Sequence, residues 1–82
     1  MPDGSAQAKP SIAALFDFLI SEFDLKNDAH LATELDKDPA CISRLRPGKL
    51  PLSSRMILAI HEHFGLPVVE IRDRSGQYTE NA

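Results

Sequence analysis

The chain lacks several features that would place it in other classes of protein. It has a single cysteine, so no disulfide forms within the chain and nothing indicates an oxidising compartment. No run of about eighteen apolar residues is present, so we expect no segment to span a membrane. No segment alternates steadily between apolar and polar residues, so we expect no sheet. The 82 residues therefore predict one small, all-α domain.

Catalytic and metal-binding motifs are also lacking. The nearest approach is His61-Glu62-His63, but residues two apart on a helix point about 200° apart and cannot close on one ion. Cys41 lies on the predicted inner side of a helix, where cysteine usually acts as a small hydrophobe. There is no phosphate-binding glycine loop. We therefore expect no enzyme activity, no metal and no cofactor.

The two ends of the chain are polar. Residues 1–10, MPDGSAQAKP, lack the apolar core of a signal peptide and are expected to form a disordered leader. Residues 73–82 are expected to form a flexible tail. The helical domain is assigned to residues 11–72, and a cytoplasmic location is the default expectation.

The most informative stretch runs from Asp28 to Lys49. Asn27 or Asp28 can cap its first helix, because a short side-chain oxygen accepts from the amides of the first turn. Leu31 and Leu35 are four residues apart and share an apolar face. The next three residues break this pattern. The spacing predicts two short helices joined by a three-residue turn.

The second helix of this stretch has two unlike sides. Asp38 is a good N-cap, and Pro39 occupies the first helical position, where proline is well tolerated. The inner side carries Cys41, Ile42 and Leu45. The outer side carries three candidates for contact with DNA base edges: Ala40, Ser43 and Arg44. Small residues allow a close approach to the bases, and an arginine can bind guanine with two hydrogen bonds.

Positive charge is concentrated on the same stretch. From Lys37 to Arg55 there are five basic residues and one acid, whereas residues 1–36 hold two basic and seven acidic residues and residues 56–82 hold two and four. This matches the electrostatic pattern of a surface that meets phosphates. The candidate phosphate contacts are Lys37, Arg46, Lys49 and the Gly48 amide.

The stretch resembles the helix-turn-helix of the lambda-repressor-like family, which includes phage repressors and Cro. The chain aligns with the family pattern in one register, with no insertion or deletion. The matching positions are Leu31, Ala32, Leu35, Ile42, Ser43, Arg44, Gly48 and Lys49. The resemblance extends from about Ile12 to Ile71. It implies five short helices, a recognition helix from Pro39 to Arg46 in the major groove of double-stranded DNA, and a role as a sequence-specific transcriptional regulator.

Three further helices are predicted from the apolar spacing. They cover Ser11 to Phe23, Ser53 to Phe64 with Gly65 as the stop, and Leu66 to Ile71 with Pro67 near its start. The predicted core contains Leu15, Phe16, Leu19, Leu31, Leu35, Ile42, Leu45, Ile57, Ile60 and Phe64.

Departures from the family pattern leave a second interpretation open. Asp36 replaces the usual turn glycine, and Lys37 replaces a residue that is commonly apolar. Asp28 stands where many members carry a polar donor to phosphate. Asp28, Phe18 and the acidic first helix favour a protein-interaction module or an antitoxin-like adaptor, with a toxin or another protein as its partner. Loss of DNA affinity with added salt would separate a DNA-binding protein from such an adaptor.

Self-association is the remaining expectation. One recognition helix contacts only a few base pairs, so a pair of domains on a two-fold axis would improve specificity. Phe18 is the first candidate for the contact because it stands alone on a polar face of its helix, and Leu58 and Val69 are the others. None forms a long patch, which predicts a weak homodimer that DNA stabilises.

Overall fold

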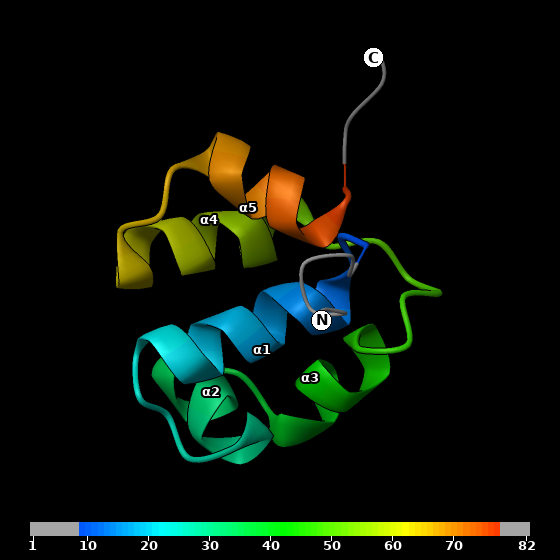
Figure 1. Ribbon diagram of the computed structural model, residues 1–82. Coiled ribbons are helices and arrows are strands. Elements are labelled where there is room, and N and C mark those ends of the chain that lie inside the picture. Colours follow the sequence, from blue (N-terminus) through cyan, green and yellow to red (C-terminus); the bar gives the residue numbers. More distant parts are fainter. Residues whose placement is uncertain (1–8, 78–82) are drawn as a thin grey trace, which may run out of the picture.

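The computed structural model describes residues 9–77. This part of the chain is all-helical, with no strand. Five helices follow one another (Figure 1): α1 (Ile12–Glu22), α2 (Asp28–Glu34), α3 (Pro39–Leu45), α4 (Ser54–Phe64) and α5 (Val68–Ser75). The all-α prediction is confirmed at this level, and none of these helices has the length and apolar character needed to cross a membrane.

Capping explains where three of the helices begin. The Oγ of Ser11 accepts from the Ala14 amide at α1, and the Oγ of Ser53 accepts from the Met56 amide at α4. At α2 the cap is Asn27, whose Oδ1 accepts from the His30 amide at 2.9 Å. Each cap gives an acceptor to an amide that has no partner within its own helix.

An aspartate at positive φ forms the turn between α2 and α3. Asp36 has a φ of 59°. The Lys37 amide donates to the Ala32 carbonyl at 2.8 Å, and the Asp36 amide donates to the Thr33 carbonyl at 3.1 Å. This pair of hydrogen bonds usually accompanies a glycine at the left-handed position. The chain then enters α3 at Asp38, which has N-cap backbone geometry but makes no side-chain capping bond.

The five helices form two packed pairs joined through α1. Helix α2 packs against α3, helix α4 packs against α5, and α1 contacts both α2 and α5. Figure 1 shows α1 between the α4–α5 pair on one side and the α2–α3 pair on the other. The main packing partner of α3 is therefore α2.

The core contains most of the residues predicted for it and several more. Its buried members are Ile12, Leu15, Phe16, Leu19, Leu31, Ala32, Leu35, Ile42, Leu52, Met56, Ile60 and Ile71. Leu45, Ile57 and Phe64 were predicted inside but only pack against its edge. Phe64 instead contacts the partly exposed Phe23, with ring centroids 4.6 Å apart. Leu45 lies in the last turn of α3, beside an exposed loop.

Helix α5 continues beyond the predicted end at Ile71, into residues that were assigned to the flexible tail. It ends at Ser75, with Gly76 at a φ of 72°. Ser75 is buried, and its Oγ donates to the Ile71 carbonyl at 2.8 Å. Arg74 and Ser75 find internal partners, so this segment continues the helix despite its polar composition. The rest of the predicted tail, 78–82, and most of the predicted leader, 1–8, lie outside the described residues.

Phe18 is half-buried, whereas the prediction had it exposed. The Arg74 guanidinium of α5 lies over its ring, with Cζ 3.5 Å from the ring centroid. Arg74 also donates from Nε to Glu70 Oε2 at 2.7 Å. A cation held over an aromatic face is attracted by the ring quadrupole. Phe18 therefore joins α1 to α5.

Truncation of Ile42 tests the packing of α3. Ile42 is fully buried, so Ile42→Ala should lower the free energy of unfolding in urea by about 2–5 kcal/mol. Leu45→Ala, at a half-buried site on the same helix, should cost clearly less. A loss below about 0.5 kcal/mol for Ile42→Ala would contradict the burial of this face of α3.

Replacement of Asp36 tests the turn. Asp36→Gly removes a side chain from the left-handed region and should raise the free energy of unfolding by up to about 1 kcal/mol. Asp38→Gly is the matched control, because it removes the same side chain at a φ of −75° and should not stabilise the protein. Equal effects of the two substitutions would show that charge rather than backbone conformation is responsible.

Candidate nucleic-acid interface

The three predicted base contacts lie together on the solvent side of α3. Ala40, Ser43 and Arg44 are all exposed. Ile42, on the opposite side of the same helix, is fully buried. Helix α3 is thus anchored by its inner face and presents two small residues and one guanidinium outward, as the sequence predicted.

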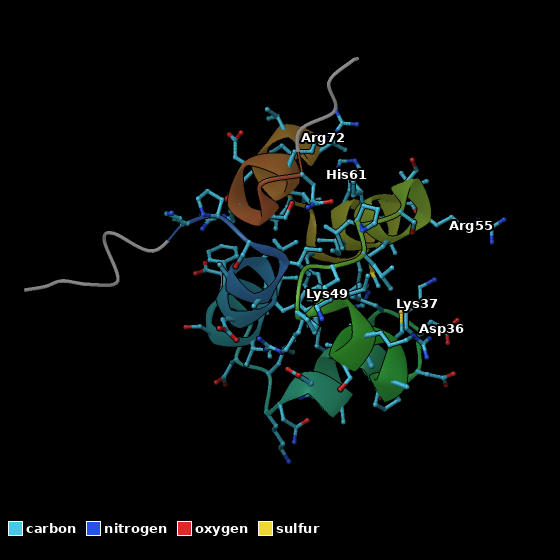
Figure 2. The ribbon with its side chains drawn as sticks, turned by 90° about the vertical axis from the view of Figure 1, so that its right-hand side faces the viewer. Asp36, Lys37, Lys49, Arg55, His61 and Arg72 are labelled. Carbon is cyan, nitrogen blue, oxygen red and sulfur yellow. The ribbon has the colours of Figure 1, made fainter. Side chains whose placement is uncertain are left out.

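Two lysines flank this surface. Lys37 precedes α3 and is half-buried, whereas Lys49 follows α3 and is exposed. Figure 2 labels both side chains beside this helix. Their ammonium groups are point charges on flexible stems, which suits contact with a phosphate backbone on either side of an inserted helix.

Arg46 differs from the other predicted phosphate contacts because its guanidinium is engaged inside the domain. Its Nε and Nη2 donate to the two carboxylate oxygens of Asp28 at 2.7 and 2.8 Å. Nη2 also donates to Asp17 Oδ1 at 2.8 Å, and Cζ lies 5.9 Å from the centroid of the Phe16 ring. This arrangement raises the pKa of Arg46 above its usual value, chiefly through the hydrogen bonds to Asp28.

The contacts of Arg46 also lower the pKa of Asp28. Hydrogen bonding by Arg46 holds the pKa of the Asp28 carboxyl below its usual value, against a smaller opposing effect of burial. The carboxylate at the start of α2 is therefore neutralised by an arginine from the end of α3. It does not cap α2, since Asn27 does so. Sequence spacing could not reveal this pair, because its members are 18 residues apart.

The Gly48 amide, predicted as a phosphate donor, has an internal acceptor. It donates to the Leu45 carbonyl at 3.0 Å, and Gly48 has a φ of 81°. Glycine is suited to this position because a left-handed backbone carries no steric penalty without a Cβ. Gly48 therefore lies two residues after the C-cap of α3 and turns the chain toward Lys49.

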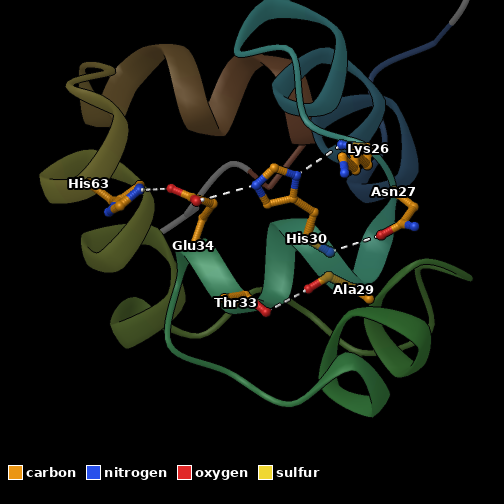
Figure 3. A network of polar contacts seen from close by, with 7 residues as sticks. All are labelled: Lys26, Asn27, Ala29, His30, Thr33, Glu34 and His63. Carbon is orange, nitrogen blue, oxygen red and sulfur yellow. Dashed lines mark hydrogen bonds and ion pairs between the residues drawn. The ribbon is translucent and has the colours of Figure 1, made fainter.

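A second polar network joins α2 to α4 (Figure 3). His63 Nε2 lies 2.7 Å from Glu34 Oε1, and His30 Nε2 lies 3.4 Å from Glu34 Oε2. The Lys26 amide donates to His30 Nδ1 at 3.0 Å, so the proton of a neutral His30 ring resides on Nε2. Hydrogen bonding by His63 is the main cause that lowers the pKa of Glu34.

The sequence analysis did not predict this network. Only the spacing of His30 and Glu34, four apart on one helix, was a signal for part of it. His61 is separate, with Nδ1 2.6 Å from the Leu66 carbonyl. Within residues 9–77, no group of three histidine, cysteine or acidic side chains is arranged to hold a metal ion.

Comparisons of the chain with protein-family models, with curated proteins and with solved structures find no match.

The Arg46–Asp28 pair makes the stability of the domain depend on pH in the acid range. Because the pKa of Asp28 is lowered on folding, its contribution is complete at neutral pH and is lost as the pH falls below about 4, through the folded-state value. Asp28→Asn should cost about 1 kcal/mol at neutral pH, since the pair is partly exposed. The free energy of unfolding of the Asp28→Asn variant should also fall less steeply than that of the parent chain as the pH is lowered.

Urea unfolding measured between neutral and strongly acidic pH checks this expectation. Asp38→Asn is the control, because Asp38 is exposed and forms no ion pair with the described residues. If Asp28→Asn and the parent chain showed the same slope in acid, the ion pair would not contribute to stability.

Proposed function

We propose that the chain is a sequence-specific regulator that binds double-stranded DNA through a helix-turn-helix of the lambda-repressor-like type. The observation that carries the proposal is α3, which is held by its buried inner face and carries Ala40, Ser43 and Arg44 outward. Two further features support the same conclusion. The chain resembles the family over Leu31–Lys49, and a short turn joins α2 to α3. The major groove of DNA is wide enough to admit one such helix.

Each outward residue of α3 has a role in this proposal. Arg44 lies in the last turn of α3 and donates two hydrogen bonds to the acceptors on the edge of a guanine. Ser43 donates to or accepts from a neighbouring base. Ala40 leaves room for the backbone of α3 to approach the groove and contacts a thymine methyl group.

The phosphate contacts are assigned to Lys37 and Lys49, and Arg46 receives a different role. Because Arg46 bonds to Asp28 in α2 and to Asp17 in α1, it is a positioning residue that sets the orientation of α3. The same contacts remove the repulsion that a bare Asp28 carboxylate would exert on a phosphate. Gly48, whose amide is already bonded, positions Lys49 rather than donating to DNA.

An antitoxin-like adaptor remains the second candidate, and a specific observation favours it. The internal contacts of Arg46 and Gly48 leave two lysines as the proposed phosphate contacts, and the chain as a whole carries a net charge of −3. Few phosphate contacts mean weak non-specific affinity and a shallow dependence on salt. In this alternative the exposed face of α3 binds a protein.

Selection from a random pool of DNA duplexes, followed by gel retardation at two salt concentrations, separates the two candidates. Recovery of one sequence motif, with affinity that falls as salt rises, is the result expected of the DNA-binding protein. Recovery of no motif, with no retarded band at low salt, would exclude the proposed function and leave the adaptor.

Substitutions on and beside α3 test the assigned roles with the selected duplex. Arg44→Ala should cost about 1–3 kcal/mol and relax the preference at one base pair, because it removes a direct base contact. Lys49→Ala should weaken all sequences alike and reduce the salt slope by about 1. Lys9→Ala removes a positive charge that lies before α1, and it should change neither the affinity for DNA nor the salt slope.

The pattern of losses distinguishes contact from positioning. Arg46→Lys cannot keep both bonds to Asp28, so it should lower specific affinity while the salt slope stays nearly unchanged. If Arg44→Ala left the sequence preference intact, the outer face of α3 would not be the base-contacting surface. If Arg46→Lys reduced the salt slope as Lys49→Ala does, Arg46 would be a phosphate contact after all.

A further inference from the structure

The loop between α3 and α4 carries Lys49, which the proposed function assigns to a DNA phosphate. This α3–α4 loop covers residues 46–53. Its middle, from Lys49 to Pro51, is exposed, and Leu50 is 50% exposed. A short exposed stretch of irregular backbone depends on contacts at its two ends for a fixed shape. The position of Lys49 therefore depends on how the two ends of the loop are held.

The first end of the α3–α4 loop is held by two contacts. The Arg46 guanidinium donates to both carboxylate oxygens of Asp28, at 2.7 and 2.8 Å. The Gly48 amide donates to the Leu45 carbonyl at 3.0 Å. These hydrogen bonds fix the chain up to the residue before Lys49, so the remaining freedom lies after it.

The second end of the α3–α4 loop is held by the side chain of Gln77. Leu52 is 7% exposed and belongs to the core, and its amide donates to Gln77 Oε1 at 3.1 Å. Pro51 comes directly before Leu52, and its ring restricts the backbone at that position. The Gln77 carboxamide thus joins the second end of the loop to the residues that follow α5.

The end of α5 is itself held against the chain that enters α1. The Ser11 amide donates to the Arg74 carbonyl at 3.1 Å. Gly76 has a φ of 72°, and a Cβ at this position would lie 3.1 Å from the Pro10 carbonyl oxygen. Figure 1 shows the α3–α4 loop passing beside the end of α5 and the start of α1. Gln77 therefore extends from a fixed support toward the loop.

We propose that Gln77 is a positioning residue for DNA binding, which holds Leu52 and thereby places Lys49 at the phosphate backbone. This inference rests on the proposed function, because phosphate is the ligand assigned to Lys49. Gln77 does not touch the DNA and acts through the α3–α4 loop. The stem of a lysine is flexible, so the place where its backbone is held decides which phosphate its ammonium group reaches. A loop held before binding also loses less entropy on binding.

A role of Gln77 in folding alone would have a different signature. A substitution that only lowers the folded fraction reduces binding by the same factor at every salt concentration. Its effect also adds to the effect of removing any DNA contact. A positioning role acts on one phosphate contact, so it changes the salt dependence of binding. Its effect disappears when Lys49 is absent.

Amide hydrogen exchange of the full chain, measured by NMR without DNA, tests the contact between Gln77 and Leu52. Gln77→Met keeps the length and charge of the side chain but removes the carboxamide oxygen. It should speed exchange of the Leu52 amide by about two- to tenfold, as loss of one neutral hydrogen bond predicts, while amides within α1 keep their rates. Gln77→Glu is the matched control, because it retains an oxygen acceptor, and its Leu52 rate should stay near that of the parent chain. Unchanged Leu52 exchange in Gln77→Met would overturn the proposal.

Binding to the selected duplex tests the step from Leu52 to Lys49. Gln77→Met should weaken binding by about two- to tenfold and reduce the salt slope by less than about 1. In a chain that already carries Lys49→Ala it should have no further effect, whereas in a chain that carries Arg44→Ala its full effect should remain.

Three results of the binding experiment count against the proposal. Unchanged affinity in Gln77→Met would show that Lys49 does not need the contact. Equal losses in the Lys49→Ala and Arg44→Ala chains would show that Gln77 acts on the fold as a whole. If the parent chain binds no duplex, the proposed function fails, and the role of Gln77 toward phosphate fails with it. That failure is distinguishable, because amide exchange measures the contact between Gln77 and Leu52 without DNA.

Discussion

The orientation of α3 depends on one guanidinium. Arg46 follows the last residue of α3 and bonds to Asp28 at the first residue of α2 and to Asp17 on α1, with the Phe16 ring nearby. Three helices thus meet at one planar cation, whose fork geometry matches the two oxygens of a carboxylate. Apolar packing through Ile42 holds α3 against the core, but it does not define a direction as sharply as a pair of parallel hydrogen bonds does.

Local signals allowed much of the fold to be predicted. Ser11 and Ser53 cap helices, Gly65 ends a helix, and apolar residues at helical spacing lie in the core. These features were predictable because each depends on residues that are only a few positions apart along the chain. The contacts of Arg46 and the Glu34–His63 pair were missed because their partners are 18 or 29 residues apart. The exposed face of α3 was predictable, since it follows from the periodicity of one helix.

Composition misled the prediction where polar residues have internal partners. The segment from Asp73 onward is rich in charge and was assigned to a flexible tail, yet Arg74 lies over Phe18 and Ser75 is buried. The same contact covers the phenylalanine that had been the first candidate for self-association. A polar residue indicates exposure only when no acceptor, donor or aromatic ring is placed to meet it, and that placement comes from other helices.

The proposed DNA contacts lie on one of the two helix pairs. Helices α2 and α3 carry them, and α1 packs against both α2 and α5. A side-chain bridge from Glu34 to His63 adds a second link between the pairs, from α2 to α4. The α2–α3 pair is therefore held against the rest of the domain by α1 and by this bridge. Residues that do not touch DNA in the proposed complex would then influence how firmly α3 is held when it meets the groove.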